Sequence, residues 1–236
     1  MADQVPAACH GEIRAAHDSG PRAPGDVSLV VLHSTEGGTA AGVARFFAAS
    51  STQASTQLVV DDGGCYRCLP DEVIPWGAPG ANRNGLHVEH VGYARWSREE
   101  WLRHEATLRR GAFHVAAWCR AYRIPVRLLT PEQLRRGARG IAAHAAVTEA
   151  FGTVGGHTDP GRGFPIEDYL GWVRGYLGNS APAKVAYTVQ LNDGPTKGPF
   201  GTLVRALAVA GWWMRAGAEN GRAVELRTVS RGSDAV

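Results

Sequence analysis

The sequence has few cysteines, no long apolar run and little net charge. A membrane-spanning helix needs about 20 consecutive apolar residues, and no run of that length is present, so stable membrane insertion is excluded. The four cysteines, Cys9, Cys65, Cys68 and Cys119, do not make a disulfide framework in a chain of 236 residues. The N-terminus lacks a basic start followed by an apolar core, so no secretory signal is predicted and synthesis in a cytoplasm is expected.

The charge balance narrows the choice of partner. The 25 basic and 22 acidic residues give a formal net charge of +3, which is too weak to argue for nucleic acid but suits an anionic polymer. A hydrophobic fraction of 44% and a charged fraction of 20% are typical of a globular protein. The length accommodates one large domain, or one medium domain and a small one.

Residues 1–25 contain many Gly, Pro and polar residues and are predicted to form an irregular N-terminal arm. The arm carries Cys9, His10 and His17. A metal site built from them is conceivable, but a loosely docked leader is the favoured interpretation.

A near-continuous apolar run at residues 27–33 predicts a buried central strand. It ends in His33, and a polar loop with two glycines follows, which is where α/β folds place their sites. A single histidine at a strand end is more often structural, so this residue alone decides nothing. Thr39 begins a predicted helix that runs to about Ser50, with an apolar face made of Val43, Phe46 and Phe47.

A β-hairpin is predicted next, with strands at residues 55–60 and 65–69 joined by an acidic, glycine-containing turn. Cys65 and Cys68 form a C-x-x-C, but residues three apart in a strand point to opposite faces. No second pair with zinc-finger spacing accompanies them, so a metal role for this pair is disfavoured. The loop that follows carries Trp76, which either packs on the core as a lid or forms a platform for a ligand.

Residues 86–91 alternate strictly and predict a strand with ionisable groups on both faces. Leu86, Val88 and His90 share one face, and His87, Glu89 and Val91 share the other. One face must therefore lie beneath a wet cleft, or the strand must lie at an edge. Glu89 is disfavoured by propensity in the middle of a strand, and a catalytic role would explain it.

The later elements alternate between helices and short strands. Residues 141–144 form a second apolar approach to a histidine, His144, and a run of small and polar residues follows it. The other expected elements are a helix at 97–122 with a capping box, a strand at 126–129, a helix starting at Thr130 with Pro at its first position, and a helix at 165–177.

The glycine- and proline-rich segment Gly155-Gly156-His157-Thr158-Asp159-Pro160-Gly161 cannot extend a helix and holds His157 and Asp159 in a rigid loop. This loop is either a plain turn with a surface histidine, or a segment that presents His157 and Asp159 for binding or catalysis. Two imidazoles and one carboxylate, with a fourth position left to water, form the ligand set of a catalytic zinc ion, and His33, His144 and Asp159 supply such a set. Glu89 would then be the general base and His157 the donor to the oxyanion. Spacing alone signals this weakly, because no H-E-x-x-H is present.

The combination of motifs is more specific. The apolar strand ending in His33-Ser34-Thr35, the STQLVVDDGG hairpin, Trp76-Gly77, the Asn84 to Glu89 strand, Ala143-His144 and the His157 to Gly161 loop occur in this order. This order resembles the zinc-dependent N-acetylmuramoyl-L-alanine amidases of type 2. That family includes phage lysozymes of the amidase type, bacterial muropeptide amidases and animal peptidoglycan recognition proteins. The resemblance covers residues 26–178.

The resemblance implies an α/β fold, with a mixed central β-sheet flanked by helices, and hydrolysis of the amide between N-acetylmuramic acid and L-alanine of peptidoglycan. It assigns one Zn²⁺ per chain to His33, His144 and Asp159, and the strand carboxylate to Glu89. His157 stands where the family often has Lys, and Thr56 and Gln57 stand where it often has an aromatic residue and a His. Thr35, Trp76 and Asn84 lie within the matching motifs and are assigned to substrate binding. We expect a monomer.

The run HVEHVGYARWS at residues 87–97 is most similar to endolysins of phages that infect actinobacteria. Such an enzyme is made in the host cytoplasm and reaches the wall after holin-type release. Two alternatives remain: a recognition protein that binds peptidoglycan without cutting it, and a cytoplasmic amidase that recycles muropeptides. Non-catalytic members typically lose a zinc ligand, and this chain retains all three together with Glu89.

Residues 179–236 lie outside the resemblance. We expect a linker at 179–184 and a small β-α-β unit at 185–236, with strands at 185–191 and 223–229 and a helix at 200–215. Trp212 and Trp213 would stack on sugar if this unit binds the cell wall, or they would belong to its core.

Overall fold

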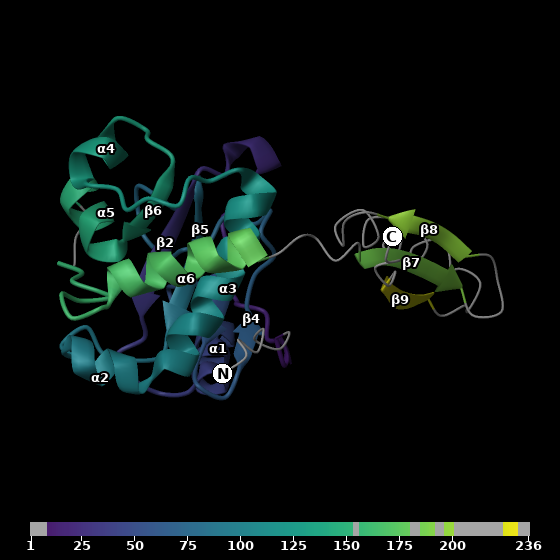
Figure 1. Ribbon diagram of the computed structural model, residues 1–236, viewed down its shortest axis with the longest axis horizontal. Helices are drawn as coiled ribbons and strands as arrows, with labels where there is room; N and C mark the ends of the chain where they lie inside the picture. The colour runs from purple at the N-terminus through teal and green to yellow at the C-terminus, as the bar shows by residue number, and fades with distance from the viewer. Residues whose placement is uncertain (1–8, 153–155, 180–184, 192–195, 201–223, 231–236) are drawn as a thin grey trace. The chain divides into compact units, whose positions relative to one another are not determined.

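The computed structural model describes residues 9–152, 156–179, 185–191, 196–200 and 224–230. The chain divides into two compact units, Met1–Gly178 and Asn179–Val236 (Figure 1). Six strands of the first unit form one sheet: β1 (Gly11–Glu12), β2 (Leu29–Ser34), β3 (Leu58–Val60), β4 (Cys65–Arg67), β5 (Gly85–His90) and β6 (Gly140–Ala143). Its helices are the 3₁₀ helix η1 (Pro24–Asp26), then α1 (Ala40–Ala48), α2 (Arg98–Arg103), α3 (Glu105–Tyr122), α4 (Pro131–Arg135), α5 (His144–Phe151) and α6 (Ile166–Asn179).

The sheet is mixed, with the strand order β1-β4-β3-β5-β2-β6. Only β3 and β4 pair antiparallel, as a hairpin; the other neighbours are parallel. The predicted fold class, a mixed sheet flanked by helices, is confirmed. Because β2 lies between β5 and β6, the carboxyl ends of these three parallel strands meet at one edge of the sheet.

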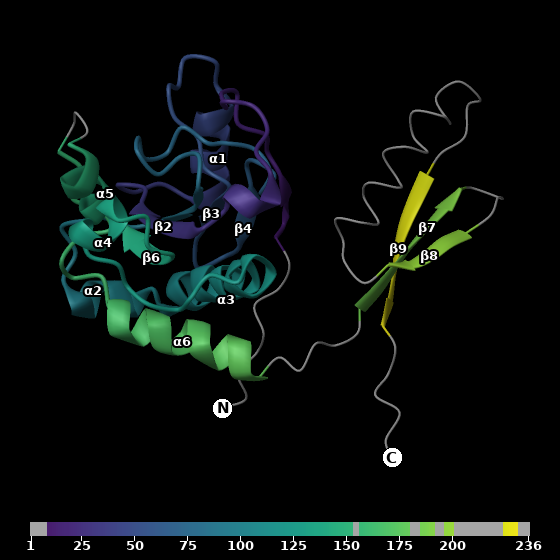
Figure 2. The same cartoon turned by 90° about the horizontal axis from the view of Figure 1, so that it is seen from above.

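Both faces of the sheet are covered, which explains why the β2 sequence is apolar at almost every position. Val30 and Leu32 pack in the core beneath α3 and α6, whereas Leu29 and Val31 pack toward α4 and α5 on the other face. Figure 2 shows α3 and α6 on the opposite side of the sheet from α1. The predicted strand at residues 27–33 and the hairpin are both present.

The sequence predicted a loosely docked N-terminal arm, but the described part of the arm is firmly attached to the sheet. Residues 11 and 12 pair in parallel with β4, and Cys9 is joined by a disulfide to Cys65, a pairing that the cysteine count did not predict. Farther along, the guanidinium of Arg22 is buried and donates to the carbonyl oxygen of Gly85 at 2.6 Å. Cys65 and Cys68 do lie on opposite faces, as expected, in two different core clusters.

Two predicted elements differ, and one helix was not predicted. The helix expected at 97–122 breaks at His104, because the carboxylate of Asp62 accepts hydrogen bonds from the backbone and hydroxyl of Thr107 and so begins α3 anew. The strand expected at 126–129 is a single bridge between Leu128 and Ile141. The small and polar run after β6 begins with the helix α5.

The second unit contains the strands β7 (Val185–Leu191), β8 (Thr196–Phe200) and β9 (Val224–Ser230), which form an antiparallel sheet in the order β8-β7-β9. β8 was not predicted, and it places Phe200 in a strand instead of at the start of a helix. The rest of the expected helix, with both tryptophans, lies outside the described residues. Among the helices of the described residues, none is long and apolar enough to cross a membrane.

Candidate active site

His33 occupies the carboxyl end of the central strand β2 and is 2% exposed. Its partner in the register with β5 is Glu89, so these two side chains stand side by side on neighbouring strands. Burial lowers the pKa of His33, although Asp159 opposes this effect. The imidazole is therefore neutral at neutral pH, which is the form that binds a metal ion.

His144 and Asp159 complete a triangle with His33. Ala143, the last residue of β6, and His144, the first of α5, stand at the edge where β2 also ends. The Oδ2 atom of Asp159 lies 3.2 Å from Nδ1 of His33, and its Oδ1 atom lies 3.1 Å from Nδ1 of His144. Burial disfavours the ionised form of Asp159, but hydrogen bonds from His144 and His33 outweigh it and hold the pKa of this carboxyl well below its usual value.

These three residues fit a zinc ion. Zinc bonds of 2.0–2.2 Å to nitrogen and oxygen in a tetrahedron place neighbouring ligand atoms about 3.3 Å apart, close to the distances between the Asp159 oxygens and the two imidazoles. All three side chains are buried, and their ligand atoms lie within 4.8 Å of one another. Two neutral imidazoles with one carboxylate leave a coordination position for water.

Glu89 lies beside this triangle, with Oε1 3.9 Å from Nδ1 of His33. Its other oxygen, Oε2, is buried and has no hydrogen-bond partner among the described residues. Burial, reinforced by the charges of Asp159 and Glu36, raises the pKa of Glu89 well above its usual value. An unpaired buried carboxylate is costly, so its position favours a role toward a bound group.

His157 forms the rim of the site. Its side chain is 46% exposed, and Nδ1 lies 3.7 Å from Oδ1 of Asp159. The ring stacks on that of His144, with the centroids 4.1 Å apart. Partial burial, together with the charge of His144, lowers the pKa of His157, so its imidazole is neutral at neutral pH.

A further histidine, His87, stands behind His33 and was not assigned a role from the sequence. Its Nδ1 atom lies 2.9 Å from Nε2 of His33, and the side chain is fully buried. Thr56 and Gln57 hold the backbone of His87: the hydroxyl donates to its carbonyl, and Oε1 of Gln57 accepts from its N–H. In this chain the two hairpin residues therefore brace β5.

The triangle opens into a cleft of about 660 Å³. Thr35 and Trp76, two of the three residues assigned to substrate binding, line the cleft. Asn84 does not: it precedes β5, so it stands at the opposite end of that strand from the cleft, and its amide donates to the hydroxyl of Ser28. Phe46, which was predicted to belong to the apolar face of its helix, instead lines the cleft with 60% of its surface exposed.

The N-terminal arm supports the wall of the cleft. The indole Nε1 of Trp76 donates to the hydroxyl of Ser19 at 2.8 Å, and the ring stacks on His17 with centroids 5.0 Å apart. His17 is itself hydrogen-bonded to the carbonyl oxygen of Ser50. Trp76 is thus held between the arm and the segment after α1.

The comparisons with known proteins agree with this arrangement. The sequence profile of the N-acetylmuramoyl-L-alanine amidase family (Amidase_2) matches residues 23–162, whereas no curated protein matches the chain. The hydrolase AmiA of Staphylococcus aureus, solved in complex with its ligand, has a TM-score of 0.60 and 16% identity, covering 76% of this chain and 90% of that chain. A mutant of PlyL has a TM-score of 0.52 and 13% identity, covering 74% of this chain and 100% of that chain.

Identities this low show the shared fold, and the profile match, which spans more than half of the chain, shows the family. The matched residues include all three corners of the triangle and Glu89. The chain belongs to the N-acetylmuramoyl-L-alanine amidase family.

Proposed function

We propose that this protein hydrolyses the amide bond between N-acetylmuramic acid and L-alanine in bacterial peptidoglycan, with Zn²⁺ held by His33, His144 and Asp159. The observation that carries the proposal is the convergence of these ligand atoms from β2, α5 and the loop before α6, at the floor of an open cleft. Zinc at such a site lowers the pKa of a bound water toward neutrality and polarises a carbonyl group.

Glu89 is proposed as the general base. Its free Oε2 atom accepts the proton of the attacking water and then delivers it to the departing amide nitrogen. A general base works best when its pKa lies near the working pH, and the raised pKa of the buried Glu89 acts in this direction.

His157 is proposed to stabilise the oxyanion from the rim of the cleft. Because its pKa is lowered, it donates a hydrogen bond as a neutral imidazole and does not supply a positive charge. Thr35 and Trp76 are proposed to contact the substrate on the cleft wall.

We also propose that the enzyme is a phage endolysin, on the strength of the HVEHVGYARWS run. It would be made in the host cytoplasm and act on the wall after holin-type release. The second unit is proposed as a wall-binding module, joined to the catalytic domain (residues 26–178) by the linker at 179–184.

The test is the release of new amino termini of L-alanine from purified peptidoglycan, measured before chelation, after chelation and after Zn²⁺ is returned. We expect release that disappears with the chelator and recovers with zinc. Binding to the wall without release would instead support the recognition protein. Release from soluble muropeptides but not from walls would support the recycling amidase.

A further inference from the structure

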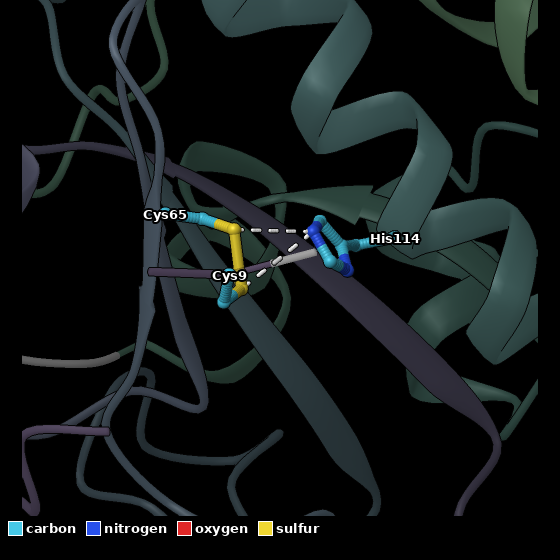
Figure 3. Close-up of side chains that lie close together, drawn as sticks. All are labelled: Cys9, Cys65 and His114. Carbon is cyan, nitrogen blue, oxygen red and sulfur yellow. Dashed lines mark hydrogen bonds between the residues drawn. A yellow bond between two sulfur atoms is a disulfide. The ribbon is translucent and has the colours of Figure 1, made fainter. Parts of the chain in front are cut away.

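A second cluster of metal-binding residue types lies away from the cleft, among Cys9, Cys65 and His114 (Figure 3). Cys9 belongs to the N-terminal arm, Cys65 begins β4, and His114 lies in the middle of α3. From the sequence, His114 is one position of the helix expected at 97–122, and no role was predicted for it. Figure 3 shows its ring facing the two bonded sulfur atoms.

The imidazole is within contact distance of both sulfurs. Nε2 of His114 lies 3.4 Å from Sγ of Cys65 and 3.7 Å from Sγ of Cys9. In a tetrahedral zinc site, bonds of about 2.3 Å to sulfur and 2.0 Å to nitrogen place a sulfur and a nitrogen ligand about 3.5 Å apart. The histidine already stands at the distance that a shared ion requires.

Burial keeps the histidine of this cluster in the form that binds a metal ion. Burial, with smaller contributions from Arg67 and Arg110, lowers the pKa of His114 to about 4, so its ring is neutral and able to bind metal. For the two cysteines outside the cluster, burial raises the pKa of Cys68 and of Cys119 to about 12, which keeps both as thiols.

We propose that Cys9, Cys65 and His114 form a second metal site when their disulfide is reduced, and that this site takes a thiophilic ion such as Zn²⁺. A dithiol reductant supplies two electrons and two protons and becomes a disulfide itself, while the S–S bond breaks to give two thiols. Binding of the ion then releases both thiol protons and forms two thiolate bonds and one imidazole bond.

The movement required is local to the arm. Two sulfurs on one zinc ion stand about 3.7 Å apart, so the bonded pair must separate. Cys65 is fixed in the sheet at 0% exposure, whereas Cys9 precedes the short strand β1. The arm is therefore linked to β4 by the disulfide under oxidising conditions, and to β4 and α3 by the metal site under reducing conditions.

The experiment uses the full chain with Co²⁺ alone as the probe, in the oxidised and in the anaerobically reduced state. Cobalt bound by thiolate absorbs in the near ultraviolet through charge transfer, and cobalt bound by the His33 triangle has no thiolate. We expect one Co²⁺ per oxidised chain without this absorption, and two per reduced chain with it. Because this comparison needs no mutation, it does not depend on the folding of any variant.

Two variants complete the design. Reduced Cys9→Ala should bind one Co²⁺ fewer and lack the charge-transfer absorption, whereas the matched control Cys119→Ala should retain both. His33→Ala should keep the absorption while the cleft site is lost, so a failure of the cleft site remains distinguishable. The proposal is wrong if the reduced wild-type chain shows no thiolate absorption, or if Cys9→Ala keeps it.

Discussion

Acid should destabilise this domain through its buried histidines, and His90 is the clearest case. His90 lies on the core face of β5 at 0% exposure, with Nδ1 3.0 Å from the carbonyl oxygen of His33 and Nε2 3.0 Å from the hydroxyl of Tyr169. Burial lowers its pKa to about 4, and the hydrogen bond to the His33 carbonyl offsets only part of this. His114, whose pKa is also lowered to about 4, should behave in the same way.

The loss of stability in acid follows from the difference between the histidine pKa values of the folded and unfolded states. A histidine in the unfolded chain has a pKa near 6.5. Between this pH and about pH 4, the unfolded chain therefore binds a proton at this residue that the folded chain does not bind. Stability is therefore unaffected above the unfolded pKa and is lost as the pH falls below it. Between pH 7 and pH 5 each group costs about 2 kcal/mol, at 1.4 kcal/mol per unit of pKa. Two such groups remove about 4 kcal/mol from a total that is typically about 5–15 kcal/mol.

Urea denaturation of the chelated, oxidised protein at pH 7 and pH 5 measures this loss. The variant His90→Gln is expected to be less stable than the wild type at pH 7, but its free energy of unfolding should fall by about 2 kcal/mol less on acidification. His10→Gln replaces an exposed histidine and should retain the wild-type difference. The reasoning is refuted if His90→Gln loses as much stability between the two pH values as the wild type does.

Three other perturbations test the catalytic unit. Glu89→Gln should keep the metal and lose about 10²–10⁴-fold in turnover of peptidoglycan, which is the usual size of a general-base contribution. The control Glu99→Gln replaces an exposed residue of α2 and should hydrolyse peptidoglycan at the wild-type rate. Full activity of Glu89→Gln would remove Glu89 from the mechanism. His87→Phe removes the nitrogen that faces His33 Nε2 and should weaken Zn²⁺ binding about 10–100-fold in a chelator competition; an unchanged affinity would mean that His87 only fills space. A chain ending at residue 178 should hydrolyse soluble muropeptides at the full rate but act more weakly on intact walls, and equal action on walls would contradict a wall-binding role for the second unit.

The parts of the fold that follow from local pattern were predictable. A run of apolar residues ending in His33 identifies a strand covered on both faces, and strict alternation around Glu89 identifies its neighbour. Once both strands are parallel and adjacent, their carboxyl ends must meet, and this brings Glu89 opposite His33 in the register. Capping boxes placed the starts of α2 and α4 correctly for the same reason: the signal lies within four residues.

The parts that depend on distant contacts were not predictable. Cys9 and Cys65 are 56 residues apart, and β1 has only two residues, which is too short for any periodicity to appear. Asn84 was assigned to the substrate because it belongs to a motif that contains Glu89. Five positions along an extended strand correspond to about 16 Å, and this distance moves Asn84 to the far end of β5.

The arm shows how such distant contacts bear on the site. A composition of Gly, Pro and polar residues predicts a segment without its own core, and the described part of the arm, residues 9–25, contains little regular structure beyond the two-residue strand β1 and the start of η1. Its order comes instead from single contacts, each made with a different element: the disulfide at β4, the stack of His17 on Trp76, and the buried Arg22 beneath β5. Trp76 lines the cleft and is held by Ser19 and His17. The N-terminal arm, whose contacts could not be predicted from the sequence, therefore fixes one wall of the cleft.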